Sequence, residues 1–260
     1  MTVETLFYVT AGLLGAALGS FMNVCIYRLP HGESVVRPRS FCPGCGKEIT
    51  ARDNIPVLSW LFLRGRCRQC GERISFQYPL VELATIGIWL GMALGYGPTL
   101  RALAGAIFFT LLLSIAITDA RHYLIPDELS IGGLASGLAL AVLTELVTGV
   151  PTILASVAGA ALGFLLLLGV GLIGDWVFKK PAMGGGDMKM MAMIGAYLGP
   201  VGAVLTIFLG ALAGSLIFGP ISLRTGKMVP FGVFLALGGA VTFLLGDALI
   251  DWYRGTFLPA

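Results

Sequence analysis

Long uninterrupted apolar runs constrain the fold of this chain more than any other feature of its sequence. Most of these runs are about 18–24 residues long, and a helix of ~20 residues spans the ~30 Å hydrocarbon core of a bilayer. Only 12% of the residues are charged and 57% are hydrophobic, whereas soluble domains carry about 25% charged residues. The sequence therefore predicts an all-α, polytopic membrane helix bundle. Its 37 glycines would allow close helix packing.

Eight apolar segments can be distinguished along the chain, and we expect about eight transmembrane helices. The segments are residues 5–27, 77–96, 101–118, 129–148, 152–175, 188–199, 201–222 and 230–250. The Met-rich segment 188–199 has only 12 residues. At about 1.5 Å per residue it cannot cross a ~30 Å core unaided. It is either a half-helix or is extended by its neighbours, and the count could be seven.

The distribution of basic residues predicts the orientation in the membrane. With residues 28–76 placed in the cytoplasm and eight helices alternating, 15 of the 17 lysines and arginines fall on the cytoplasmic side, as the positive-inside rule requires. Nine lie in the loop, and the others are Arg121, Lys179, Lys180, Lys189, Arg224 and Lys227. Both termini then face outward. The net charge of +3 reflects this bias, so no nucleic-acid partner is needed to explain it.

Four of the five cysteines form two CxxC pairs inside the 28–76 loop. They are Cys42, Cys45, Cys67 and Cys70, with 21 residues between the pairs and a glycine after each pair. Four thiolates suit tetrahedral Zn²⁺ and leave no open position, which is typical of a structural site. A cytoplasmic loop disfavours disulfides, and no thioredoxin-like pattern supports a redox role. The fifth cysteine, Cys25, reads as a small buried hydrophobe in the first helix.

Two aspartates lie at the ends of apolar runs, where a carboxylate is costly to desolvate and tends to mark function. Asp119 ends the run 104–118, and Asp187 follows the glycines 184–186. The predicted topology puts both on the cytoplasmic face, together with Asp127. Two adjacent carboxylates share one proton, so the ionised member can activate a water while the protonated member donates to a developing oxyanion.

Several motifs give the chain a resemblance to one known family over nearly its whole length. Besides the cysteine pairs, they are GSFMNVCIYRLP at 19–30, DNIP at 53–56, YPLVE at 78–82, GGGDMK at 184–189 and VPFG at 229–232. With these motifs the chain resembles the type IV prepilin peptidases, the bacterial prepilin leader peptidase/N-methyltransferases of the GxGD aspartic protease type.

The resemblance implies an enzyme of the bacterial inner membrane that removes the basic leader from type IV prepilins or type II secretion pseudopilins on the cytoplasmic side. Carried over, Asp119 and Asp187 are the catalytic pair, and Asp127 is the reserve for the first position. Residues 1–27 would be the first membrane helix and 77–260 the peptidase domain, whose apolar substrate helix stays in contact with lipid.

The resemblance also implies that the 28–76 loop takes part in methylating the new N-terminal amine with S-adenosylmethionine. No G-x-G-x-x-G motif marks a cofactor site, so this expectation rests on the resemblance alone. The candidates for the methyl-transfer site are Glu33, Asp53, Asn54 and Glu82.

Two other classes of function stay open from the residues. A proton- or cation-coupled transporter could use Asp119 and Asp187, although these acids lie at one face and not at the membrane midplane. A zinc-stabilised scaffold would explain the loop but not the two aspartates.

Overall fold

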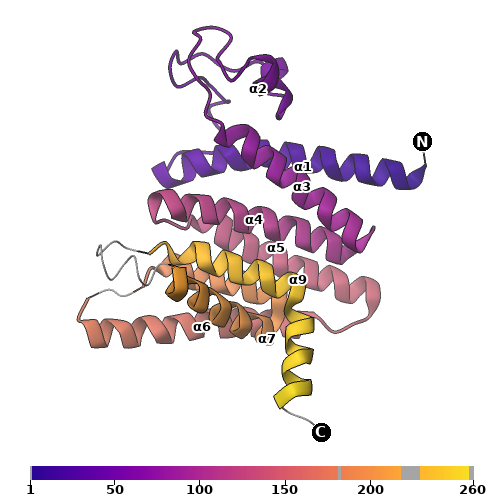
Figure 1. Cartoon of the computed structure of the whole chain (residues 1–260), viewed down its shortest axis with the longest axis vertical. Coiled ribbons are helices and arrows are strands. Elements are labelled where there is room, and N and C mark those ends of the chain that lie inside the picture. Colours follow the sequence, from indigo (N-terminus) through magenta and orange to yellow (C-terminus); the bar gives the residue numbers. More distant parts are fainter. Residues whose placement is uncertain (1, 181–182, 218–228, 258–260) are drawn as a thin grey trace. The chain divides into compact units, whose positions relative to one another are not determined.

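The computed structural model describes residues 2–180, 183–217 and 229–257. Within these ranges the regular structure is helical, apart from two isolated β-bridges in the cysteine loop. Seven of the helices are long and apolar enough to cross a membrane, so the predicted all-α, multi-pass membrane fold is confirmed. The chain divides into two compact units, Met1–Thr110 and Leu111–Ala260, whose helices are labelled in Figure 1.

The first unit is built on two long helices that approach closely at glycines. Its elements are α1 (Val3–Arg28), η1 (Leu29–His31), η2 (Ala51–Asp53), α2 (Leu58–Phe62), α3 (Gln77–Tyr96) and the first part of α4 (Leu100–His122). A Cβ atom on Gly19 of α1 would come within 2.8 Å of the Cα of Glu82 in α3, and one on Gly15 within 3.0 Å of the Cα of Ile86. Side chains at either glycine would force α1 and α3 apart, which is why small residues serve at membrane helix contacts.

The second unit packs its helices in the same way. It contains the end of α4 with α5 (Asp127–Thr148), α6 (Ile153–Phe178), α7 (Gly185–Ile217) and α9 (Phe231–Phe257). The closest approach is between α6 and α7, where a Cβ atom on Gly159 would meet the backbone of Gly195 and the reverse substitution would meet Gly159. The Ser156 hydroxyl also donates to the carbonyl of Ala196 at 2.6 Å.

α7 folds back on itself at Gly199. This residue has φ 71° and ψ −177°, a conformation that glycine adopts without strain, and Pro200 follows it. A Cβ atom on Gly163 of α6 would meet Met191, which precedes the turn, and also Ala203, which follows it. Since residues from both sides of Gly199 lie beside the same residue of α6, the two limbs of α7 run in opposite directions.

The contacts between helices place several helix ends at one end of the second unit. Gly171, near the end of α6, faces the side chain of Met188 at the start of α7. Gly214, near the end of α7, faces Phe234 at the start of α9. The end of α6, both ends of α7 and the start of α9 therefore lie together.

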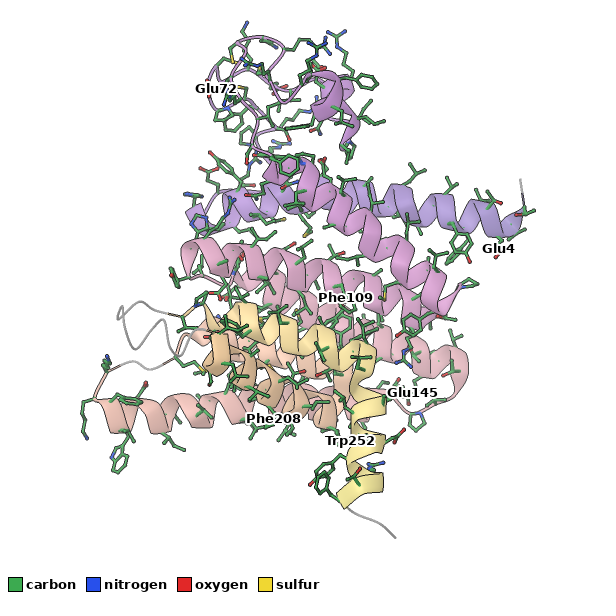
Figure 2. The ribbon with its side chains drawn as sticks, viewed as in Figure 1. Glu4, Glu72, Phe109, Glu145, Phe208 and Trp252 are labelled. Carbon is green, nitrogen blue, oxygen red and sulfur yellow. The ribbon has the colours of Figure 1, made fainter. Side chains whose placement is uncertain are left out.

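The connection between α5 and α6 lies at the opposite end of the unit. The carboxylate of Glu145, labelled in Figure 2, accepts hydrogen bonds from the backbone N–H groups of Thr152 and Ile153, each at 3.0 Å. The first N–H groups of a helix have no hydrogen-bond partner within it. The Glu145 carboxylate supplies that partner and so caps the N-terminus of α6.

The observed helices correspond to the eight predicted apolar segments. Each segment overlaps one helix, and the segments 188–199 and 201–222 share α7 as its two limbs. The first limb is extended to Gly185, as one of the two readings of the short segment required. Arg224 and Lys227, which contributed to the predicted orientation, and the end of segment 201–222 lie outside the described residues.

Candidate active site and metal site

The carboxylate of Asp119 lies at the start of α9, although Asp119 itself belongs to the end of α4. Asp119 is 6% exposed. Its Oδ2 atom accepts a hydrogen bond from the backbone N–H of Val233 at 3.2 Å, and the N–H of Gly232 also bonds the carboxylate. The first N–H groups of a helix have no partner within it and favour a negative charge. A Cβ atom on Gly232 would lie 2.9 Å from Oδ2, so the glycine makes room for this contact.

Asp187 lies in the first turn of α7, directly after the three glycines. Its carboxylate accepts a hydrogen bond from the N–H of Gly184, and its own N–H donates to the Gly184 carbonyl at 3.3 Å. The carboxylates of Asp187 and Asp119 interact electrostatically. The structure thus brings together the two aspartates that the sequence pointed to, at one end of the second unit.

Ile125 is wedged between the two backbone segments that carry this pair. A Cβ atom on Gly186 would lie 2.9 Å from the Cβ of Ile125, and one on Gly232 would lie 2.8 Å from its Cδ1. Ile125 is 7% exposed. A branched side chain in this position holds the start of α7 and the start of α9 at a fixed separation, so it helps to position both carboxylates.

Asp127, the reserve for the first position, has a different partner. Its two carboxylate oxygens accept hydrogen bonds from the Lys189 ammonium at 2.7 and 2.6 Å. The side chains of Asp127 and Lys189 are 53% and 39% exposed. The ion pair ties the start of α5 to the first limb of α7, two residues beyond Asp187.

The four predicted zinc ligands converge in the first unit. Their Sγ atoms all lie within 4.8 Å of one another, and those of Cys42 and Cys70 are 3.7 Å apart. With Zn–S bonds of about 2.3 Å, sulfurs of a tetrahedral site are about 3.8 Å apart. Backbone N–H groups of Cys70 and Gln69 lower the pKa of the Cys67 thiol to about 7, whereas burial and the neighbouring thiols raise the pKa of Cys70 to about 12. The cluster could therefore hold a structural metal ion.

Two equivalent turns build this cluster. The N–H of Gly46 bonds the carbonyl of Cys42 at 2.8 Å, and the N–H of Gly71 bonds that of Cys67 at 3.0 Å. Both glycines have positive φ, 69° and 75°, which explains the glycine after each pair. Glu72, labelled in Figure 2, follows the second turn.

The four candidates for methyl transfer lie in different surroundings. The Asp53 carboxylate is held by the Arg68 guanidinium, with N–O distances of 2.8 to 3.0 Å, and this partner keeps the pKa of Asp53 below its ordinary value. Glu33 and Asn54 are exposed, whereas Glu82 is only 7% exposed. The Glu82 carboxylate accepts a hydrogen bond from the backbone N–H of Val57 in the loop at 2.7 Å.

Ile125, Lys189 and Gly232 were not predicted as parts of the site, although Lys189 and Gly232 end two of the motifs quoted above and Ile125 stands two residues before Asp127. Their positions in the sequence could have identified these residues. Ile125 and Lys189 each stand within two residues of an aspartate in question, and a glycine at the start of an apolar segment leaves space for a neighbouring side chain.

Comparison with known proteins identifies the class of protein that carries this site. The sequence profile described as "Type IV leader peptidase family" matches residues 106–219, and the one described as "Bacterial Peptidase A24 N-terminal domain" matches residues 13–96. No solved structure matches the chain. The protein is thus a multi-pass membrane protein with a peptidase segment in its second unit.

Several named relatives match nearly the whole chain. A prepilin leader peptidase/N-methyltransferase of Aeromonas hydrophila is 36% identical over 97% of this chain and 96% of its own length. Proteins of the same name from Bacillus subtilis and Dichelobacter nodosus are 34% and 36% identical over 93% and 90% of this chain. The chain belongs to the type IV leader peptidase family, as its motifs predicted. Nothing in these comparisons supports the transporter reading.

Proposed function

We propose that this protein is an aspartic endopeptidase that removes the basic leader from type IV prepilins or type II secretion pseudopilins and then methylates the new N-terminal amine. The family membership and the names of the relatives support both activities. The observation that carries the peptidase mechanism is the meeting of Asp119 and Asp187, from helices far apart in sequence, at one end of the second unit.

In this mechanism the two carboxylates act as one unit. Adjacent carboxylates share a proton because both cannot easily ionise. The ionised member accepts a proton from a water molecule, which attacks the scissile carbonyl, and the protonated member donates to the developing oxyanion. Backbone N–H groups of Gly232, Val233 and Gly184 hold the pair, and fixed hydrogen bonds of this kind keep catalytic groups in their productive geometry.

The proposed substrate geometry follows from the position of the pair at a helix end. In the predicted topology this end faces the cytoplasm, and both termini lie outside the bacterial inner membrane. A prepilin has a basic leader followed by an apolar helix, so its cleavage site would reach the same depth while the apolar helix stays among lipids. Glu128, which is exposed at this end, offers negative charge to a basic leader, whereas the charge of Asp127 is paired with Lys189.

The proposed cofactors serve the first unit. The four cysteines would hold one structural Zn²⁺, whose thiolate ligands leave no open position for catalysis. S-adenosylmethionine would supply the methyl group for the N-terminal amine.

Cleavage of a model prepilin by the purified protein tests this proposal. Wild type should release the leader, and Asp119→Asn and Asp187→Asn should each reduce the rate by at least 10³-fold while the protein stays folded, because each removes one half of the acid–base pair. If Asp127→Asn abolishes cleavage and Asp119→Asn does not, Asp127 takes the first position. Absence of cleavage by folded wild type would overturn the peptidase assignment.

A further inference from the structure

A cavity of about 530 Å³ lies in the first unit, between the second half of α1 and the loop that follows it. Ligand pockets are commonly ~300–1,000 Å³. The polar residues along this cavity include Ser20 and Arg28 from α1, and Ser40 and Asn54 from the loop. Apolar side chains such as Phe21 contribute the rest of the lining, so the cavity suits a ligand with both polar and apolar parts.

A buried carboxylate joins the two walls of this cavity. Glu82 of α3 accepts the backbone N–H of Val57 at 2.7 Å, and the Ser20 hydroxyl hydrogen-bonds the same carboxylate. Ser20 lines the cavity from α1, and Pro56, directly before Val57, lines it from the loop. Glu82 therefore fastens the loop wall to the helix wall.

The loop wall is strained at the point where Glu82 holds it. Val57 has φ 62° and ψ −52°, a left-handed φ that is rare for a β-branched residue. Such conformations persist only when the surroundings impose them, and they cluster at functional sites. The Glu82 carboxyl group, buried in the second turn of α3, provides the compensation here through its 2.7 Å hydrogen bond from the Val57 N–H.

We propose that this cavity is the methyl-donor site, that it binds S-adenosylmethionine, and that Glu82 positions its wall. The inference rests on the proposed methylation and deepens it. The residues fit the donor: the apolar lining suits adenine, the serines and Asn54 suit ribose hydroxyls, and Arg39 suits a carboxylate. The Arg28 guanidinium already donates to the carbonyls of Ser34, Pro38 and Arg39, so it holds the loop wall in place. The cavity lies entirely within residues 13–96, the part of the chain outside the peptidase match.

The chemistry at this site would be a methyl transfer that balances without another reactant. The bond between the methyl carbon and the sulfonium sulfur breaks and leaves its electron pair on sulfur, while the lone pair of the new N-terminal amine forms the C–N bond. The methylated ammonium then releases a proton to water. In this scheme Glu82 is a positioning residue and does not touch the reacting atoms.

Photolabelling of the full-length protein in detergent with S-adenosyl-[methyl-³H]methionine tests the site without any turnover. Ala17 lines the cavity, so Ala17→Trp should fill it and reduce labelling at least tenfold. Leu13→Trp places the same bulk one turn earlier on α1, at a residue that is 67% exposed and outside the lining, and it should label like wild type. Zinc content and the unfolding temperature report whether each variant is folded.

Two substitutions of Glu82 separate positioning from chemistry. Glu82→Gln keeps an oxygen that can accept the Val57 N–H, so labelling and methylation should stay within about threefold of wild type. Glu82→Ala removes the acceptor and should raise the KM for the donor at least tenfold. A kcat lost in both variants with KM unchanged would contradict the positioning role and indicate a base.

The outcomes distinguish this inference from the proposed function beneath it. Wild type that neither binds the donor nor methylates a cleaved prepilin would overturn the methylation itself. Wild type that methylates, with Ala17→Trp labelled normally, would overturn only the assignment of the cavity. Native mass spectrometry that finds a phospholipid retained by wild type and lost from Ala17→Trp, with donor binding unchanged in both, would assign the cavity to lipid instead.

Discussion

Substituting Gly232 by alanine should damage catalysis through the position of one carboxylate, without removing any catalytic group. The added Cβ would lie 2.9 Å from Oδ2 and 3.1 Å from Cγ of Asp119. Carbon and oxygen atoms that are not bonded stay about 3.4 Å apart or more. The carboxylate must therefore move by about 0.5 Å, the difference between 3.4 and 2.9 Å.

This displacement can be converted into an expected rate. A misplacement of about 1 Å costs about 10²-fold in rate, so half of that distance should cost about tenfold, or ~1.4 kcal/mol in the activation free energy. The shift also stretches the 3.2 Å hydrogen bond from Val233 to Oδ2. A hydrogen bond to a charged group contributes ~1.5–3 kcal/mol. We therefore expect kcat/KM for leader cleavage to fall about 10- to 100-fold.

The assay is leader cleavage under kcat/KM conditions, with Gly169→Ala in α6 as the matched control. A Cβ atom on Gly169 meets nothing within 4 Å, so this variant should cleave at the wild-type rate and gain up to ~1 kcal/mol of helix stability. Thermal unfolding of Gly232→Ala should remain cooperative, which separates a displaced carboxylate from a misfolded protein.

A folded Gly232→Ala protein with wild-type kcat/KM would refute the reasoning. It would mean either that Asp119 tolerates a half-ångström shift or that Asp119 is not at the reacting atoms. Asp119→Asn then decides between these two explanations, because it leaves the shape of the side chain unchanged and removes its charge.

The remaining predictions concern the ion pair, the metal and the helix crossing. Lys189→Met should lower the free energy of unfolding by at most ~1 kcal/mol, because exposed ion pairs contribute little. The double mutant with Asp127→Asn should add no further loss in urea unfolding. Cys67→Ser should reduce zinc from about one ion per chain to well below half, as measured by atomic absorption, because a structural site needs all four ligands. Gly159→Ala should lower the unfolding temperature by several degrees, since backbone atoms of Gly195 cannot move aside as a flexible side chain can.

The sequence predicted the helices and the site residues that depend on local pattern. The length of each apolar run predicted a membrane helix, because a run of this length spans the bilayer as a helix and the backbone groups must be paired within it. The cysteine spacing predicted a convergent cluster, since each CxxC turn closes on its own glycine. The two aspartates were selected as candidates for a similar reason, because charges at the end of an apolar run are conspicuous.

The contacts that could not be predicted all join residues far apart in the sequence. The N–H of Val57 meets Glu82, 25 positions later, and the Lys189 ammonium meets Asp127, 62 positions earlier. No periodicity or propensity connects such partners. The positive φ of Val57 was equally hidden, because a β-branched residue is the one least expected there. Turn rules identify such positions only when they carry glycine or asparagine.

The glycines of the helix crossing and the aspartates of the candidate site are mechanically connected. Gly195 is held against Gly159 of α6, and eight residues earlier on the same limb stands Asp187. Eight residues of α-helix span ~12 Å and behave as a rigid rod. A side chain at the crossing would therefore displace the whole limb, and the Asp187 carboxylate would move with it away from Asp119. Gly159→Ala should therefore reduce the rate of cleavage by more than its loss of stability explains, although Gly159 lies in α6 and both carboxylates belong to other helices.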